Sequence, residues 1–455
     1  MLRGSVASCD RLATGCRIWP YRAGGCLEDT FRDRLTAAPG NARTWRLDMH
    51  LAIYIRSVES ARGAERVAVN VARGLAARGH RVDFLVEESG EWLSHQTSGD
   101  SVRIVDLRAG RRPSLADRLM QLWAFCLHLI SSPRALLTRG DACLFPVAQV
   151  LYKDAPPLLA LRRYLRHAKP HAVLSFLNYP NTVLLLTAQI HRGDTRFVVS
   201  VRNHMSAAAA HNESAWVRSV PRLMRRLFGL ADSVVVPSRG VADDVAAITG
   251  MARERIAVIY NPVYRPELIR MADAPVDHPW LADGNEPIVM GSGKFKQQKD
   301  FPTLLRAFAK VRAVRPARLI VLGEGEDEPA LRQMAADLGI AADVDFPGHV
   351  DNPYAYYRRA SVFVLSSIWE GLPNVLIEAM ACGCPVISTN CPSGPDEILD
   401  GGRFGTLVPV GQVDAMADAI LATLSGAPPR APLIARAREF SLDQAVRRFE
   451  AVMAG

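Results

Sequence analysis

The sequence predicts an α/β protein of two domains, each with a parallel sheet that helices cover on both faces. Three observations support this prediction. The chain has 455 residues, which is too long for one typical core and suits two domains of about 200 residues. Apolar runs of strand length alternate with helical patterns, as is typical of parallel sheets. The alternation breaks once, between residues 262 and 287, where Pro, Asp and Ala are frequent.

The first series of elements begins directly after Met49 and predicts an N-terminal domain over residues 49–265. Val67, Val71 and Leu75 form one apolar stripe, and Gly79 ends that helix. Predicted strands lie at 50–55, 81–86, 102–107, 172–176, 196–201, 233–238 and 255–260, and predicted helices include 64–78, 158–168, 214–229 and 240–249.

The second series predicts a C-terminal domain over residues 266–438, followed by a helix within 439–455 that is a candidate for packing back on the N-terminal domain. Two such domains in tandem place the carboxyl ends of two parallel sheets across a cleft, where ligands usually bind. Predicted strands lie near 287–292, 317–322, 344–347, 361–366, 385–389 and 406–409.

Residues 1–48 are rich in Arg, Gly and Thr and lack the apolar core of a secretory signal. We interpret them as a disordered extension or as a misassigned start. No apolar run reaches the roughly 18–20 residues that cross a bilayer. The nearest, 119–130, contains Gln121 and His128 and is better read as a buried or interfacial helix.

The net charge of +9 favours an anionic partner. Because no nucleic-acid motif is present, we expect a phosphorylated substrate or an anionic membrane surface rather than nucleic acid.

The eight cysteines fit neither a zinc site nor a disulfide framework, which favours free thiols in a reducing compartment. Asp343 and Asp345 have the spacing of a metal motif, but Val344 and Phe346 alternate inward, so we expect both aspartates on the exposed face of a strand and no metal.

Two segments of the C-terminal half have the features of a ligand site. Gly293 and Lys294 follow a strand, Lys299 precedes a helix, and such a basic turn at a helix start can hold a diphosphate without a metal. Glu370 lies on a loop after another strand, and Glu378 lies about one turn into the next helix. A solvated basic turn and two solvated glutamates are the alternatives that the residues leave open.

These segments, taken in order with three others, resemble the retaining GT-B glycosyltransferases of family 4 over about residues 49–455. That family has two Rossmann-like domains that face each other across a cleft. The matching features are Arg62-Gly63-Ala64-Glu65-Arg66-Val67, Val258-Ile259-Tyr260-Asn261-Pro262, Gly293-Lys294 with Lys299, Glu370-x7-Glu378, and Ser393-Gly394-Pro395 with Glu397.

The resemblance implies a donor site in the C-terminal domain and no catalytic metal or cofactor. Glu378 would bind the donor ribose, Glu370 would lie near the donor sugar, and Lys294 and Lys299 would clamp the diphosphate. Lys294 replaces the usual Arg, so charge is kept but bidentate contact is lost. Other implied donor contacts are Gly293, Gly371, Leu372, Asn374 and Val375, with His349 and Val350 beside the nucleobase.

The resemblance also implies that the N-terminal domain binds the acceptor. Gly63 at the first β–α turn would admit a ligand closely, although a plain tight turn is the alternative. Arg202, Asn203 and His204 end a strand at the expected cleft edge, where many relatives have an active-site histidine. We predict catalytic roles for His204, Glu370, Lys294 and Lys299, with a structural role of His204 as the alternative.

The predicted reaction is transfer of a hexose or N-acetylhexosamine from a UDP-sugar to a lipid-linked sugar or polysaccharide precursor, with retention of configuration. The loop Ser393–Glu397 favours UDP by resemblance. The helix 214–229 contains Arg218, Arg222, Arg225 and Arg226, which favour a peripheral location at the inner face of the cytoplasmic membrane. A surface helix that packs only on its own sheet is the alternative. The alternatives are a nucleotide-sugar epimerase of the same fold and a non-catalytic sugar- or lipid-binding protein.

Overall fold

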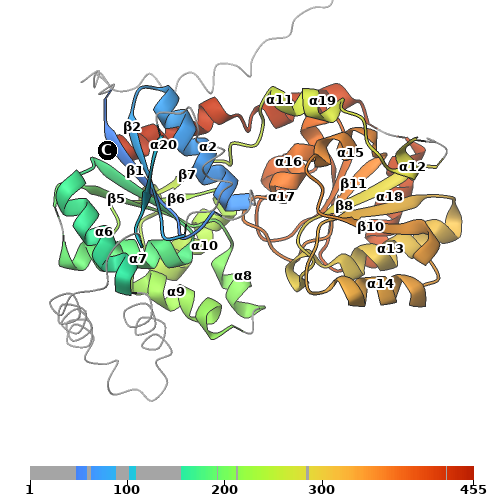
Figure 1. Cartoon of the computed structure of the whole chain (residues 1–455). Helices are drawn as coiled ribbons and strands as arrows, with labels where there is room; N and C mark the ends of the chain where they lie inside the picture. The colour runs from blue at the N-terminus through green and yellow to red at the C-terminus, as the bar shows by residue number, and fades with distance from the viewer. Residues whose placement is uncertain are drawn as a thin grey trace, which may run out of the picture. The chain divides into compact units, whose positions relative to one another are not determined.

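The computed structural model describes residues 48–58, 63–88, 102–108, 155–191, 193–211, 214–282, 286–426 and 428–455. These residues belong to one compact unit, Leu47–Gly455. They form two parallel sheets, which appear on the left and right of Figure 1. The prediction of two Rossmann-like α/β domains is therefore confirmed. The predicted helix at 119–130 and the interpretation of residues 1–47 lie outside the described residues.

The N-terminal sheet has the order β3-β2-β1-β4-β5-β6-β7. Its central strands are buried along nearly their whole length, as expected for a parallel sheet with helices on both faces. The strands are β1 (His50–Tyr54), β2 (Arg81–Val86), β3 (Val102–Asp106), β4 (Ala172–Phe176), β5 (Arg196–Ser200), β6 (Ser233–Val236) and β7 (Ile256–Val258).

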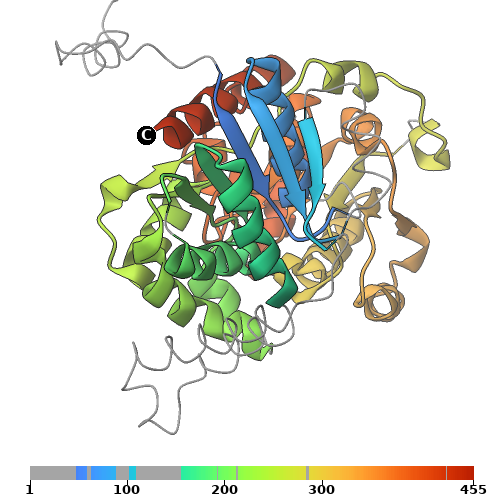
Figure 2. The same ribbon diagram turned by 60° about the vertical axis from the view of Figure 1, so that its left-hand side comes forward.

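Helices cover both faces of this sheet, as Figures 1 and 2 show. One apolar cluster joins the sheet to α6, α7, α9 and α10, and a second joins it to α2. The helical segments are α2 (Gly63–Ala77), α6 (Ala155–Ala168), α7 (Asn178–Ile190), α8 (Met205–Ala210), α9 (Ala215–Leu227), η2 (Phe228–Leu230), α10 (Arg239–Thr249) and η3 (Arg253–Arg255).

The C-terminal sheet has the order β10-β9-β8-β11-β12-β13. In both sheets the order in which the chain adds strands reverses beside the first strand of the sheet. In such sheets the crevice at the reversal point is the usual ligand site. The strands are β8 (Ile288–Ser292), β9 (Arg318–Leu322), β10 (Val344–Gly348), β11 (Val362–Leu365), β12 (Val386–Thr389) and β13 (Thr406–Val408). The helical segments are η4 (Gln297–Lys299), α13 (Phe301–Val314), α14 (Glu328–Asp337), η5 (Ala341–Asp343), α15 (Pro353–Arg359), α16 (Asn374–Ala381), α17 (Pro395–Leu399), α18 (Val413–Ser425) and α19 (Arg430–Arg438).

The last helix, α20 (Leu442–Ala454), returns to the N-terminal domain and packs on α2. Val446 lies so close to Gly74 that a Cβ on the glycine would stand 2.3 Å from a valine methyl group. Phe449 is fully buried among residues of β1 and α2. Glu450 accepts hydrogen bonds from Arg78 at 2.6 Å and pairs with His80 at 3.1 Å, which adds a buried polar contact to the apolar one.

The interruption between residues 262 and 287 is not the plain linker that its composition indicates. It contains α11 (Glu267–Ala272) and α12 (Pro279–Ala282). Leu268 is fully buried in the apolar cluster of the C-terminal domain, because this segment packs on α15. A short helix with one buried leucine has too little periodicity to stand out in a Pro-rich stretch.

The placement of the two aspartates corrects another expectation. Asp343 lies in η5 before the strand, not on its exposed face, and binds Arg312 and Arg318 at 2.7 and 2.8 Å. Asp345 lies on β10, half-exposed, 3.0 Å from the His278 ring. Among the described residues no group of three or more His, Cys, Asp or Glu side chains is arranged to hold a metal ion. Nor does that part of the chain contain a helix long and apolar enough to cross a membrane.

Three of the eight cysteines fall within the described residues, and the other five lie outside them. Cys382, Cys384 and Cys391 are free and buried. Burial raises the pKa of the Cys382 and Cys391 thiols to about 12 and that of Cys384 further. Neutral, enclosed thiols of this kind act as small apolar side chains.

Candidate functional site

The predicted phosphate loop follows β8 and is fixed by the neighbouring strand. The Gly293 N–H donates to the Leu322 carbonyl at 3.0 Å, and the Phe295 N–H donates to the Glu324 carbonyl at 2.9 Å. Phe295 is fully buried, so the loop is anchored between its lysines. At its end Asp300 caps α13 through Thr303, which starts the helix directly after Lys299. The predicted turn before a helix is therefore present.

Sequence reasoning missed two glycines that shape this loop. A Cβ on Gly323 would stand 2.0 Å from the Gly293 carbonyl oxygen, and a Cβ on Gly325 would stand 2.2 Å from the Phe295 carbonyl oxygen. The segment after β9 thus packs backbone against backbone on the phosphate loop. The available signal was a Gly-x-Gly pattern directly after a predicted strand, a place where close backbone approach is common.

Three lysines gather on this loop. Lys294 is exposed, while Lys296 and Lys299 are partly buried. Burial, followed by the charges of Lys299 and Lys294, lowers the pKa of Lys296. Lys296 was not among the predicted site residues, although it lies between the two lysines that were. The loop has three lysines, and one carboxylate, that of Glu370, pairs with them. This excess of positive charge favours an anionic ligand.

That carboxylate belongs to Glu370. The Lys299 Nζ lies 2.6 Å from the Glu370 carboxylate, and the Ser367 hydroxyl donates to the same oxygen at 2.7 Å. The Glu370 side chain is only 8% exposed, so the solvated alternative is wrong for this residue. The structure therefore brings together two predicted catalytic residues that are 71 positions apart in the chain.

The residues after Glu370 form a tight junction between the two domains. A Cβ on Gly371 would stand 2.1 Å from the Arg202 carbonyl oxygen, so only glycine fits there. Leu372 is buried just before α16, and Asn374 and Val375, the first two residues of that helix, are half-buried. Asn261, which precedes the interruption, donates to the Asn374 side chain at 2.5 Å. The Glu370 loop thus contacts both the strand end at Arg202 and the chain that connects the domains.

Glu378 is buried in α16, one turn into the helix as predicted. Its carboxylate lies 3.1 Å from Arg66 of α2, and Arg66 also donates to the Tyr354 hydroxyl at 3.1 Å. Burial raises the pKa of Glu378, and Arg66 and Arg265 oppose the rise. The alternative of a solvated glutamate is therefore wrong for Glu378 as well. Its partner Arg66 is 312 positions away, so sequence spacing gave no indication of the pair.

A small cavity adjoins this ion pair. It is lined by residues of both domains, including Arg66, Asn70, Arg265, Tyr354, Asn374 and Glu378. A larger pocket of about 470 Å³ lies beside β3 and α6, with Arg103, Tyr164 and His167 in its wall. None of the predicted site residues lines the larger pocket. We therefore centre the candidate site on Glu370 and Glu378.

The predicted acceptor residues occupy the N-terminal side of the junction. Gly63 starts α2 with φ of +42° and has open space where a Cβ would lie. The Arg202 guanidinium donates to Asn261 and lies over the Phe176 ring, and loss of solvent lowers the pKa of Arg202 to about 9. Ala61 and Arg62, the other residues of the predicted turn, lie outside the described residues.

His204 and Asn203 have local structural contacts. The Asn203 side chain accepts from the His204 N–H at 3.0 Å. The His204 ring caps α8 by accepting from the Ala207 N–H at 3.3 Å, with Asp244 at 3.5 Å. These contacts favour the structural alternative for His204, while its predicted catalytic role stays a prediction.

The predicted nucleobase segment lies at the end of β10. Gly348 has φ of +82°, which turns the chain out of the strand. His349 is exposed, and Val350 packs partly against the apolar cluster below α16. Among the described residues, no hydrogen bond or ion pair joins His349 or Val350 to Glu370 or Glu378, so their role in the site stays a prediction.

Comparison with known proteins supplies the family context. The model for Glycosyltransferase Family 4 matches residues 61–264, and the model for Glycosyl transferases group 1 matches residues 276–440. The two matches divide at the same interruption as the two sheets. Together they cover most of the described chain.

Two curated relatives and one solved structure are similar to the chain. An N-acetylgalactosamine-N,N'-diacetylbacillosaminyl-diphospho-undecaprenol 4-alpha-N-acetylgalactosaminyltransferase of Campylobacter jejuni is 27% identical over 57% of this chain and 69% of its own length. The lipopolysaccharide core biosynthesis glycosyltransferase LpsE of Rhizobium meliloti is 35% identical over 42% of this chain and 54% of its own length, so the chain spans about half of that relative. HepE of Anabaena, solved with UDP and glucose, is 16% identical, has a TM-score of 0.67 and is covered over its full length by 90% of this chain.

Proposed function

Because the chain belongs to glycosyltransferase family 4 and has the GT-B fold, we propose that it transfers a hexose or N-acetylhexosamine from a UDP-sugar to a lipid-linked sugar or polysaccharide precursor, with retention of anomeric configuration. The observation that carries the proposal is the ion pair between Lys299 and the buried Glu370. The loop that contains Lys299 has two further lysines, Lys294 and Lys296. A donor diphosphate supplies the negative charge that this loop lacks.

The transfer needs one bond to form and one to break. An acceptor hydroxyl oxygen bonds to the anomeric carbon, and the bond from that carbon to the β-phosphate oxygen breaks. UDP leaves with the electron pair of that bond, and the proton of the hydroxyl passes to the departing phosphate oxygen. Lys294, Lys296 and Lys299 oppose the charge that develops on the leaving diphosphate. The burial of Lys299 strengthens this interaction, since water does not screen it fully.

The start of α16 suits the remainder of the donor. The first N–H groups of a helix lack intrahelical partners and attract phosphate, so the backbone of Asn374 and Val375 is positioned to donate to it. Glu378, one turn further on, presents a carboxylate that accepts hydrogen bonds from ribose hydroxyl groups. Burial raises the pKa of this carboxyl, and its contact with Arg66 opposes that rise.

We further propose that the protein acts at the inner face of the cytoplasmic membrane. The names of the two curated relatives, an undecaprenol diphosphate-linked saccharide transferase and a lipopolysaccharide core enzyme, support a lipid-linked acceptor. In α9, Val220, Leu223 and Leu227 are buried while Arg218 and Arg222 are exposed. Arg225 is also exposed, but its guanidinium donates to the Ile248 carbonyl at 3.0 Å, and Arg226 is half-buried.

A thermal-shift screen with UDP, GDP and ADP tests the donor. A ligand at about 100 times its Kd stabilises the fold by about 2.7 kcal/mol, which is readily measured. We expect UDP to raise the Tm. Lys299→Ala should abolish the shift, whereas Lys310→Ala, an exposed lysine of α13, should keep it. A shift with GDP but not UDP would contradict the proposed donor.

Product analysis separates the proposal from its alternatives. Incubation with UDP-sugars and lipid-linked acceptors should release UDP and give a product with the donor's anomeric configuration, as measured by nuclear magnetic resonance. Conversion of the UDP-sugar to an epimer without acceptor would instead identify an epimerase. Binding of UDP-sugars with no turnover on any acceptor would identify a binding protein.

A further inference from the structure

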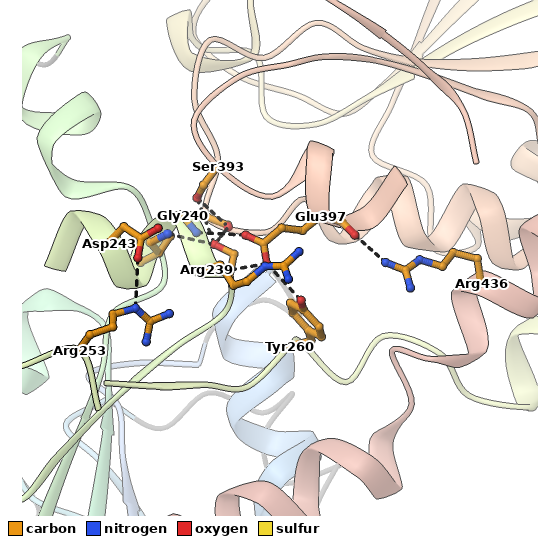
Figure 3. Close-up of polar contacts among 11 residues, drawn as sticks. Arg239, Gly240, Asp243, Arg253, Tyr260, Ser393, Glu397 and Arg436 are labelled. Carbon is orange, nitrogen blue, oxygen red and sulfur yellow. Dashed lines mark hydrogen bonds and ion pairs between the residues drawn. The ribbon is translucent and has the colours of Figure 1, made fainter. Parts of the chain in front are cut away.

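Glu397 is a buried carboxylate that the proposed reaction does not use. It lies on α17 of the C-terminal domain, yet its carboxylate faces the first residues of α10 in the N-terminal domain (Figure 3). The N–H groups of Arg239 and Gly240 donate to its two oxygens at 2.9 and 3.0 Å. The Tyr260 hydroxyl donates to it at 3.1 Å. The side chain is only 7% exposed, so these contacts lie largely out of water.

These contacts satisfy the start of α10 from across the domain boundary. The first N–H groups of a helix have no partner within the helix, and this end is electrically positive. Ser238 accepts from the Val241 N–H at 3.3 Å, which is ordinary capping within one domain. Glu397 accepts hydrogen bonds from the two preceding N–H groups, those of Arg239 and Gly240. The carboxylate therefore completes the cap of a helix that belongs to the other domain.

The same helix end contacts the Glu370 loop. The Ser238 hydroxyl donates to the Gly371 carbonyl at 2.7 Å and lies 3.1 Å from the Ser393 hydroxyl. Gly240 faces Ser393 so closely that a Cβ on the glycine would stand 2.5 Å from the serine Cβ. The start of α10 thus fixes the position of Gly371, directly after the carboxylate that pairs with Lys299.

Glu397 is also held firmly on its own side. Arg436 of α19 donates to the Glu397 carbonyl at 2.6 Å and to the Ile398 carbonyl at 3.0 Å. Figure 3 shows the resulting series of contacts from Arg436 through Glu397 to α10. Glu397 is therefore anchored both to its own domain and to α10.

We propose that Glu397 is a positioning residue that holds the N-terminal domain against the Glu370 loop, and so aligns the acceptor side with the donor side. Its carboxylate is only 7% exposed and accepts three hydrogen bonds from the protein, so we assign it no contact with the donor. The reaction that Glu397 would align is the one given under the proposed function, so that part of the inference rests on it. The contact of Glu397 with the start of α10 is independent of the proposed function.

The matched pair Glu397→Ala and Asp396→Asn tests this role. Asp396 is the neighbouring residue of α17 and is exposed, and both changes remove one negative charge. In Glu397→Ala we expect hydrogen exchange of the amides at the start of α10 to rise by about tenfold or more. UDP affinity should change little, because the proposed donor contacts lie within the C-terminal domain. The rate of UDP release from UDP-glucose or UDP-N-acetylglucosamine in the presence of acceptor should fall by about a hundredfold. Asp396→Asn should match the wild type in all three measurements.

A second pair of variants tests the same contact from the other domain. Gly240→Ala places a methyl group against Ser393, whereas Gly229→Ala meets no atom within 4 Å. Alanine favours helix over glycine, so the clash alone explains any loss in Gly240→Ala. We expect retained UDP affinity and reduced turnover for Gly240→Ala, and no change for Gly229→Ala. This pair decides the question if Glu397→Ala does not fold.

Two results would overturn the proposal. One is wild-type amide exchange and turnover in Glu397→Ala. The other is loss of UDP affinity in proportion to turnover, which would indicate general destabilisation rather than misalignment. A wild-type protein that binds no UDP would refute the proposed donor, while the amide exchange of the variants would still test the contact of Glu397 with α10.

Discussion

Glu378 determines how donor binding is expected to depend on pH. Its carboxyl is buried between α2 and α15, and that burial raises its pKa above the ordinary value of 4.5. The charged or titratable groups around it are Arg66, Arg265, Tyr354, Tyr357 and Cys382. Glu378 and Tyr354 raise the pKa of Arg66 despite its burial, so Arg66 keeps its charge in acid. Burial raises the pKa of the two hydroxyl groups and the thiol, which therefore stay neutral. Glu378 is therefore the group of this cluster that changes its charge as the solution becomes acidic.

We predict that affinity for UDP-glucose falls on acidification with a midpoint above pH 4.5. Only the ionised carboxylate accepts two hydrogen bonds from the ribose, and a raised pKa means that protonation begins at a higher pH than for a solvated glutamate. UDP-glucose is the suitable ligand because its phosphates do not titrate in this range. Calorimetric titration from pH 8 to pH 4.5 measures the effect.

Glu378→Gln serves as the control for this prediction. The amide keeps the size of the side chain but does not titrate, so its weaker UDP-glucose binding should be independent of pH. A wild-type protein whose affinity is flat to pH 4.5, or a Glu378→Gln variant with the wild-type pH profile, would contradict the role of this carboxylate.

At the residue scale the sequence identified the two glutamates but not their partners. Glu370 and Glu378 stand at a fixed spacing around a strand–turn–helix, which is local information. Arg66 and Lys299 reach them from other elements, and those contacts depend on how the elements pack. The burial of both carboxylates also depends on packing, which is why solvated glutamates remained an alternative.

At the element scale, the backbone contact between the Gly323–Gly325 segment and the phosphate loop predicts a sensitive position. Gly323 has φ of +129°, a region that side chains rarely adopt, and a Cβ would stand 2.0 Å from the Gly293 carbonyl oxygen. Gly323→Ala should therefore shift Gly293 and the lysines after it. We expect a loss of stability of about 1–3 kcal/mol and a loss of UDP affinity larger than the stability loss explains.

Gly339→Ala isolates the conformational part of this effect. Gly339 also has a positive φ, +70°, but a Cβ there would meet no atom within 4 Å. Denaturant unfolding of both variants measures the cost of the backbone strain at a positive φ. UDP titration of both variants measures whether the phosphate loop is displaced. Normal UDP affinity in Gly323→Ala would mean that this segment does not shape the phosphate loop.

The strands were predictable because each is a short apolar run bounded by turn residues. Helices were predictable where one face is polar, as in α2 and α10. The helix α7 was not predicted, because nine of its residues, from Pro180 to Ala188, are buried and no polar face marks a helical period. The short helix α11 was hidden by the composition around it. Burial on all sides and short length remove the periodic signal on which sequence reasoning depends.

At the scale of the whole molecule the sequence predicted two domains but not the surfaces that join them. Trp369 shows why. It precedes Glu370 in the C-terminal domain, yet its side chain is buried in the apolar cluster of the N-terminal domain and stacks on His211 with the ring centroids 5.2 Å apart. A tryptophan in an apolar run reads as part of its own core. Its placement in the other domain follows only from the arrangement of the sheets.

The whole molecule also carries the charge on which the proposed membrane location rests. The net charge is +9, and each Lys or Arg near an anionic surface contributes about 1 kcal/mol. We predict that the protein sediments with vesicles containing anionic phosphatidylglycerol but not with neutral phosphatidylcholine vesicles. Salt should release it, because the screening length falls from about 10 Å at 0.1 M to about 3 Å at 1 M.

Charge reversal locates the binding face. Arg218→Glu with Arg222→Glu changes two exposed positions of α9, whereas Arg270→Glu with Arg403→Glu makes the same change in net charge at exposed positions of the C-terminal domain. If α9 is the membrane face, only the first pair weakens sedimentation. Equal weakening by both pairs would mean that the charge acts without a preferred face. No sedimentation with anionic vesicles at low salt would refute the membrane location, and the acceptor would then have to be a soluble glycan.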